Sequence, residues 1–302
     1  MNETTPLHTR TLRYDSRPLG GNALGLLAEL RDVRHVGFGN RFGREHPAGV
    51  VHHMGLETEI GGDGVVRTAD AWMQAAPFDA SPETRGEGCR DVLGSYRTLI
   101  ALALDDSYAL GVLGCVGGPK GCFHVSSLAQ GLPWVVRAAR ESAGELRRAI
   151  TVAAHAGTGA GVEFTCSLAD RVGAVDTVRA EIVCTLRVPG MEILAAEGRV
   201  GLPPGAARVD ADRVHRLAGL VVTKEFTTAA LEAVGEGAVF PPLVVAFAPV
   251  TAQAVGAFAA FRGGDQTPSG RSRRFASQVD SCHMWRSDGP LVALADAAGG
   301  TR

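Results

Sequence analysis

The chain has 302 residues, a formal net charge of −2 at pH 7 and six scattered cysteines. Its length accommodates two domains of ordinary size. The charge argues against a nucleic-acid or membrane-surface partner, because such proteins carry a basic patch. No apolar run is long enough to span a bilayer and residues 1–13 lack a signal-peptide core, so we expect a cytoplasmic protein without a membrane partner. The scattered cysteines argue against a disulfide framework.

The first half of the chain predicts a small sheet followed by helices. Residues 1–21 are polar and predict an arm or a first edge strand, and residues 26–36 predict a strand. Residues 50–60 and 65–73 predict a hairpin around the glycine turn 61–64. Residues 92–104 predict a short helix or packed connector, and residues 107–116 a helix capped by Gly117. A glycine turn at 117–121 then leads into a helix that ends near Arg140.

The second half repeats this order after an Ala/Gly linker at residues 153–161. Residues 164–172 resemble 27–36, residues 180–186 and 191–200 resemble the hairpin, and residues 217–261 resemble the helices, with a period of roughly 120 residues. Chance similarity between two Ala/Val-rich halves is the alternative. We therefore predict an α+β fold with two tandem copies of a small antiparallel sheet, each with helices on one face, related by a pseudo-twofold.

Three units follow from this repeat. Residues 1–150 form the unit that carries the chemistry, residues 160–262 a degenerate second copy, and residues 263–302 a tail that returns to the site. In the second copy Val178 stands near the place of His52, and Phe240 and Pro242 stand near the places of Cys122 and His124. We therefore expect the second copy to serve as a scaffold or a lid.

Cysteine and histidine gather at three places: 52–53, 122–124 and 282–283. Cysteine sulfur and histidine nitrogen suit zinc or iron, and three or four such ligands make a site. We predict that Cys122, His124, Cys282 and His283 are the metal ligands. The alternative is a buried cysteine and a hydrogen-bonded histidine in a tight turn.

We expect the remaining reactive side chains to have catalytic roles around that metal. Cys122 lies at the start of a helix, where the helix dipole favours a thiolate. His52 and His53 point to opposite faces of a strand, so at most one of them joins the site directly. We predict His52 or Asp70 as the acid or base, and Arg286 as a group that orients the substrate.

Several motifs carry a family resemblance. They are 52–54 (His-His-Met), 67–71 (Arg-Thr-Ala-Asp-Ala), 76–78 (Ala-Pro-Phe), 117–124 (Gly-Gly-Pro-Lys-Gly-Cys-Phe-His), 280–283 (Asp-Ser-Cys-His) and 286–289 (Arg-Ser-Asp-Gly). Together they resemble an uncharacterised bacterial domain-of-unknown-function family with a Gly-Cys-Thr-His-Leu motif and a terminal Cys-His/Tyr-x-x-Arg-x-Asp-Gly motif. The resemblance covers most of residues 24–140 and the tail. The family has Cys-Pro where this chain has Ser81-Pro82, so one thiol of the family pattern is missing.

More distantly, the order of elements is similar to the NifU/SufU-like iron–sulfur scaffold fold. In that fold three cysteines and an Asp or His hold zinc or a cluster. The resemblance implies that Cys122 takes the place of the helix-mouth cysteine, Ser81 that of the loop cysteine, and His52 that of the hairpin acid. It implies a fold and a site location, and it supplies no activity.

Three functions compete on these observations. The first is a zinc- or iron-dependent enzyme acting on a small organic molecule, a lyase, isomerase or cyclase of specialised bacterial metabolism. The second is a metal- or sulfur-binding scaffold of the iron–sulfur assembly type. The third is a metal-free acid–base enzyme that uses Cys122 and His124. We expect no nucleotide cofactor, because the chain has no phosphate loop or dinucleotide fingerprint, and we leave a homodimer open.

Overall fold

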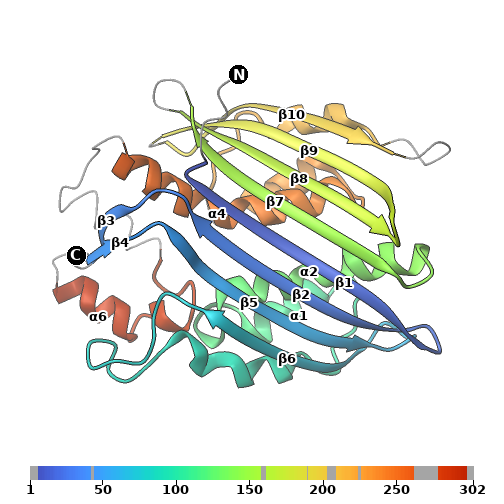
Figure 1. Ribbon diagram of the computed structural model, residues 1–302, viewed down its shortest axis with the longest axis horizontal. Helices are drawn as coiled ribbons and strands as arrows, with labels where there is room; N and C mark the ends of the chain where they lie inside the picture. Colours follow the sequence, from blue (N-terminus) through green and yellow to red (C-terminus); the bar gives the residue numbers. More distant parts are fainter. Residues whose placement is uncertain are drawn as a thin grey trace.

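An eight-stranded antiparallel sheet forms the centre of the molecule, with its helices packed on one face (Figure 1). The computed structural model describes residues 6–41, 44–157, 161–188, 190–202, 209–223, 226–261 and 278–297. The strand order in the sheet is β10-β9-β8-β7-β1-β2-β5-β6. This arrangement confirms the predicted α+β class.

The strands of the main sheet fall into two sets of four. The first set is β1 (His8–Gly20), β2 (Ala23–Arg34), β5 (Gly49–Ile60) and β6 (Val66–Ala75), and the second set is β7 (Leu146–Ala156), β8 (Gly161–Val172), β9 (Val175–Arg187) and β10 (Ile193–Gly201). The short strands β3 (Phe38–Arg41) and β4 (Arg44–His46) pair separately. Because β1 pairs with β7, the two sets join into one sheet.

Each set of strands is followed by helices. After the first set come η1 (Cys89–Leu99), α1 (Tyr108–Val116), η2 (Gly118–Lys120) and α2 (Phe123–Glu141), and after the second set come η3 (Ala211–Leu217), α3 (Phe226–Val234) and α4 (Phe240–Phe261). The tail contributes η4 (His283–Trp285) and α6 (Pro290–Ala297). None of the helices in the described ranges is long and apolar enough to cross a membrane.

Alternating side chains explain why the helices cover only one face. Along β2, Leu24, Leu26, Ala28 and Leu30 are all buried, whereas Leu27 and Glu29 are less covered. Such a period of two directs one apolar row toward the helix layer. In that layer α2 approaches β1 closely at Gly131, where an added Cβ would lie 2.2 Å from the Tyr14 hydroxyl oxygen.

Most predicted elements of the first half are confirmed, and one is wrong. The hairpin 49–75, the helix 108–116 with Gly117 as its C-cap, and the helix that ends at Glu141 all form. Residues 8–20, predicted as an arm or edge strand, instead form the central strand β1 between β2 and β7. Its inward residues, such as Leu12 and Tyr14, are buried because strands and helices surround them.

In the main sheet, the second half repeats the order of the first, four strands and then helices. The sheet order is symmetrical about the β1–β7 pair. The predicted linker at 153–161 is wrong in its first part, because β7 continues to Ala156 and pairs with β1 and β8. The pseudo-twofold and the three-unit division stay predictions, which superposition of residues 161–261 on 24–140 tests. In the tail, residues 263–277 and 298–302 lie outside the described ranges.

Candidate metal centre

Two polar side chains continue the apolar, inward-facing rows of neighbouring strands. Asp32 follows Ala28 and Leu30 at the same spacing of two along β2, and His52 precedes Met54 at that spacing along β5. Asp32 and His52 lie directly opposite each other in the β2–β5 register. Both side chains therefore point into the helix layer, where both are buried.

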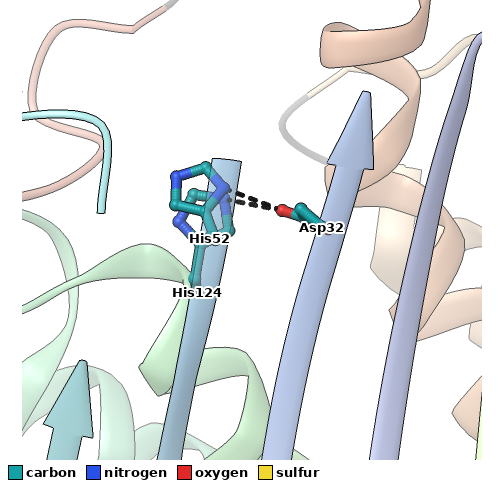
Figure 2. Close-up of side chains that lie close together, drawn as sticks. All are labelled: Asp32, His52 and His124. Atoms are coloured by element: carbon teal, nitrogen blue, oxygen red, sulfur yellow. Dashed lines mark hydrogen bonds and ion pairs between the residues drawn. The ribbon is translucent and has the colours of Figure 1, made fainter. Parts of the chain in front are cut away.

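His124 reaches the same point from the helix layer. It is the second residue of α2, directly after Phe123 and the N-cap Cys122. Figure 2 shows the two histidine rings together beside the Asp32 carboxylate. The His52 Nδ1–Asp32 Oδ2 distance is 2.9 Å and the His124 Nε2–Asp32 Oδ2 distance is 3.7 Å. The rings stack with their centroids 3.8 Å apart.

These three residues form a group that could hold a metal ion. One ligand atom from each of Asp32, His52 and His124 lies within 4.8 Å of the other two. Among the residues that the structure describes, no other group of three or more His, Cys, Asp or Glu residues has its ligand atoms this close to one another. Two imidazoles and a carboxylate are a donor set that zinc and non-haem iron both accept.

Asp32 is the centre of a buried ionic cluster. Arg10 donates to both carboxylate oxygens, from Nε to Oδ1 and from Nη2 to Oδ2, each at 2.7 Å. His8 Nε2 lies 3.5 Å from Oδ1. Burial raises the pKa of Asp32, but the charge and hydrogen bonds of Arg10, with further bonds from His52 and His8, hold it well below its usual range. Asp32 is therefore ionised at neutral pH.

The two histidines are neutral at the same pH. Burial lowers the pKa of His52, and burial together with the nearby His52 and Arg10 holds the pKa of His124 well below its usual range. An ionised carboxylate only accepts hydrogen bonds, so the neutral His52 must carry its proton on Nδ1. The lone pair on His52 Nε2 is then available, since only Nδ1 carries the proton.

Cys122 lies beside this group as a protonated thiol. Its Sγ is 3.8 Å from His124 Nδ1, and the Tyr96 hydroxyl bonds both the Cys122 N–H and its carbonyl. Burial raises the pKa of the Cys122 thiol to about 12. The expectation of a thiolate at the helix start is wrong, because the loss of solvation outweighs the helix dipole.

The tail packs against the glycine turn, next to Cys122. The His283 N–H donates to the Gly121 carbonyl at 2.9 Å. Glu87 then anchors the tail, because it accepts from Arg286 Nη1 and Nη2 at 2.6 and 2.8 Å and lies 3.2 Å from His283 Nε2. A metal shared by Cys122, Cys282 and His283 stays a prediction. The converging group in the structure contains only one of the predicted ligands, His124.

Two other residues that the sequence singled out lie apart from the Asp32 group. The Asp70 carboxylate is about two-thirds exposed, at 66 %, and pairs with Arg97 on the surface. Ser81, at the position of the family cysteine, accepts a hydrogen bond from the Thr84 N–H within its own loop. Nothing in these contacts connects either residue with the histidine pair.

Sequence reasoning missed Asp32, Arg10 and Glu87. For Asp32 a signal was present, because a charged residue that continues an inward apolar row needs a buried partner. The same signal occurs in the second half. Arg148 donates to both oxygens of Asp170 at 2.7 Å, and both pairs are separated by 22 residues in sequence. Glu87 has no such pattern around it, since it lies in a loop.

The second half lacks the histidines of this centre. Val178 lies opposite Asp170 in the β8–β9 register, where His52 lies opposite Asp32 in the β2–β5 register. This agrees with the expectation that Val178 stands at the place of His52. The buried ion pair thus occurs in both halves, whereas the candidate metal centre occurs in the first.

One protein-family model matches part of this chain. Residues 8–137, which contain the complete Asp32 group, match the family model described as "Protein of unknown function (DUF2889)". This agrees with the expected resemblance to an uncharacterised domain family, while the similarity to iron–sulfur scaffolds stays a prediction. No curated protein and no solved structure matches the chain.

Proposed function

We propose that the chain is a metal-dependent enzyme acting on a small organic molecule, with zinc or iron held by Asp32, His52 and His124. The observation that supports this proposal most is the convergence of their three ligand atoms within 4.8 Å. This set takes the place of the sequence-derived set, with which it shares His124. Lyase, isomerase and cyclase reactions are the types that we carry forward from the sequence.

The chemistry of the residues fits such an ion. Metal ligands must be deprotonated, and here the carboxylate is already ionised and both imidazoles are already neutral. Arg10 donates to both oxygens of Asp32. The nitrogens of His52 and His124 approach Oδ2 at 2.9 and 3.7 Å, so Oδ2 is the carboxylate oxygen that would face a shared ion. A bound ion would supply Lewis-acid chemistry to a substrate oxygen.

The surrounding side chains have separate tasks in this proposal. Arg10 keeps Asp32 ionised, and Asp32 fixes the orientation of the His52 ring through the 2.9 Å bond. Cys122 holds its proton at neutral pH, which disfavours a role as a nucleophile. Arg286, anchored by Glu87, keeps its proposed role in orienting the substrate.

A metal-free acid–base enzyme is the second candidate, and one contact favours it. Cys122 Sγ, His124 and Asp32 form a chain with distances of 3.8 Å and 3.7 Å. This order is that of a thiol nucleophile, its base and an orienting acid. Against it stand the raised pKa of the Cys122 thiol and the lowered pKa of His124, which together disfavour a thiolate–imidazolium pair.

Metal binding by matched variants separates the two candidates. Purified protein is loaded with Zn²⁺, or anaerobically with Fe²⁺, and the metal affinity is measured by competition with a chelator. We expect about one ion per chain, and a loss of affinity of at least about 10- to 100-fold in His52→Ala and His124→Ala. His283→Ala is the control, because His283 contacts Glu87. Wild-type protein that binds no ion, or His124→Ala that binds as well as wild type, contradicts the proposal.

A further inference from the structure

The outward side of α1 is apolar, although it lies on the surface of the molecule. The nine residues of this helix include no charged side chain. Tyr108, Val112 and Val116 are buried, whereas Leu110 and Leu113 point outward and are 73 % and 50 % exposed. A helix that is apolar all round is normally buried on every side. The outward side of α1 therefore has the composition of an interface.

The corresponding helix of the second half shows that the fold itself does not require this composition. α3 also has nine residues, and it buries its first, fifth and ninth side chains, as α1 does. Where α1 has Leu110 at its third position, α3 has the exposed Thr228. Where α1 has Gly114 at its seventh position, α3 has the exposed Glu232. The apolar outward side of α1 therefore needs a cause of its own.

Opposite charges lie at the two ends of this apolar side. The exposed Asp106 stands four residues before Leu110 and so extends the same side of the helix beyond its start. At the other end, the exposed Lys120 reaches back to α1, where its Nζ donates to the Gly114 carbonyl at 2.6 Å. From Asp106 to Gly114 the chain rises about 12 Å, at about 1.5 Å per residue. The surface thus has a negative end, an apolar middle and a positive end.

Such a surface is complementary to a second copy of itself. When two identical helices cross antiparallel about a twofold axis, each end of one helix meets the opposite end of the other. Asp106 then lies beside the partner's Lys120 at both ends of the contact, and Leu110 packs against the partner's α1. A parallel crossing would bring like charges together instead. The order of the charges therefore favours the antiparallel pair.

We propose that the α1 face, formed by Leu110 and Leu113 with Asp106 and Lys120 at its ends, binds a second copy of this chain in an antiparallel, twofold homodimer. Because one side of a nine-residue helix is small beside the interfaces of permanent dimers, we expect a Kd in the micromolar range. The dimer does not depend on the candidate metal centre, so it is tested on protein from which metal has been removed.

Sedimentation velocity of chelator-treated protein, from about 1 to about 100 µM, measures the dimer. We expect the wild type to pass from monomer to dimer over this range, at about 50 mM salt, where exposed charges are weakly screened. Leu110→Thr, which gives α1 the residue of α3, should weaken dimerisation at least about 10-fold, because the apolar contact is lost in both copies. Thr228→Ala on α3 is the matched control and should leave Kd unchanged. A wild type that stays monomeric, or Leu110→Thr that dimerises as well as the wild type, overturns the proposal.

Charge reversal tests the antiparallel arrangement. Asp106→Lys brings two lysines together at both ends of the contact, and Lys120→Asp brings aspartates together, so each variant alone should dimerise about 10-fold more weakly than the wild type. An equimolar mixture of the two variants should dimerise again, because every lysine of the mixed dimer meets an aspartate. Glu232→Lys on α3 is the control for a general effect of charge. A mixture that dimerises no better than the single variants overturns the proposal.

Discussion

Replacing Asp32 by asparagine tests the buried ionic cluster on which the candidate centre is built. Asp32 is 0 % exposed and accepts two hydrogen bonds of 2.7 Å from Arg10 and one of 2.9 Å from His52. An asparagine at this position would keep the shape of the side chain but remove its charge. The Arg10 guanidinium, itself 1 % exposed, would then be a buried charge without a counter-charge.

Breaking a buried ion pair by removing one partner costs about 3–5 kcal/mol. Domains unfold with a free energy of about 5–15 kcal/mol, so we expect Asp32→Asn to remain folded but much less stable. Urea unfolding at pH 7.5, followed by far-UV circular dichroism, measures the loss. Replacing the whole pair, with Arg10→Met and Asp32→Leu together, should recover most of it, because apolar side chains need no counter-charge.

Asp170→Asn is the matched control in the other half of the sheet. Asp170 accepts the same two bonds from Arg148, but it faces Val178 and not a histidine. We therefore expect both variants to lose about 3–5 kcal/mol, and only Asp32→Asn to lose metal affinity. A loss below about 1 kcal/mol in Asp32→Asn, the range of an exposed pair, would refute the reasoning that this cluster is buried and charge-balanced.

Three further outcomes follow from the contacts. Because burial lowers the pKa of His52 and His124 from 6.5, the unfolded chain binds protons that the folded chain excludes. The free energy of unfolding should therefore fall as pH drops below 6.5, by at most about 1.4 kcal/mol per pH unit for each histidine. Urea unfolding at pH 5.5 and at pH 7.5 measures this difference, and equal free energies of unfolding at the two pH values would contradict the prediction. Gly131→Ala should cost about 1–3 kcal/mol, because its Cβ would meet the buried Tyr14 ring. Gly114→Ala, with open space around it, should be neutral or stabilising in thermal unfolding. Cys122, whose thiol pKa is raised to about 12, should react with iodoacetamide at pH 7.5 far more slowly in the folded than in the urea-unfolded protein. Equal reaction rates in the folded and the unfolded protein, measured by mass spectrometry, would contradict the burial of Cys122.

The local elements could be read from the sequence because their signals are local. The hairpin strands around the 61–64 turn and the helix after Cys122 each follow from alternation, glycine position or helical spacing. The place of β1 could not be read in this way. Its central position depends on pairing with β7, which begins 126 positions after the last residue of β1, and no local pattern encodes such a partner.

The candidate centre was predicted in part. His52 and His124 were singled out, and the structure brings them together, but their common partner Asp32 was overlooked as a charge within an apolar strand. The thiols were favoured because cysteine is a strong metal ligand, whereas the state of Cys122 depends on its burial by neighbouring elements. The corresponding ion pairs Arg10–Asp32 and Arg148–Asp170 show that charged residues on inward rows are the signal to follow.

X-ray absorption at the zinc edge of the zinc-loaded protein tests the central claim most directly. Ligation by Asp32, His52 and His124 predicts a first shell of nitrogen and oxygen at about 2.0–2.1 Å, and a spectrum that Cys122→Ser leaves unchanged. Sulfur at about 2.3 Å that disappears in Cys122→Ser would contradict the claim, because the ion would then be held by the cysteine and not by the Asp32 group.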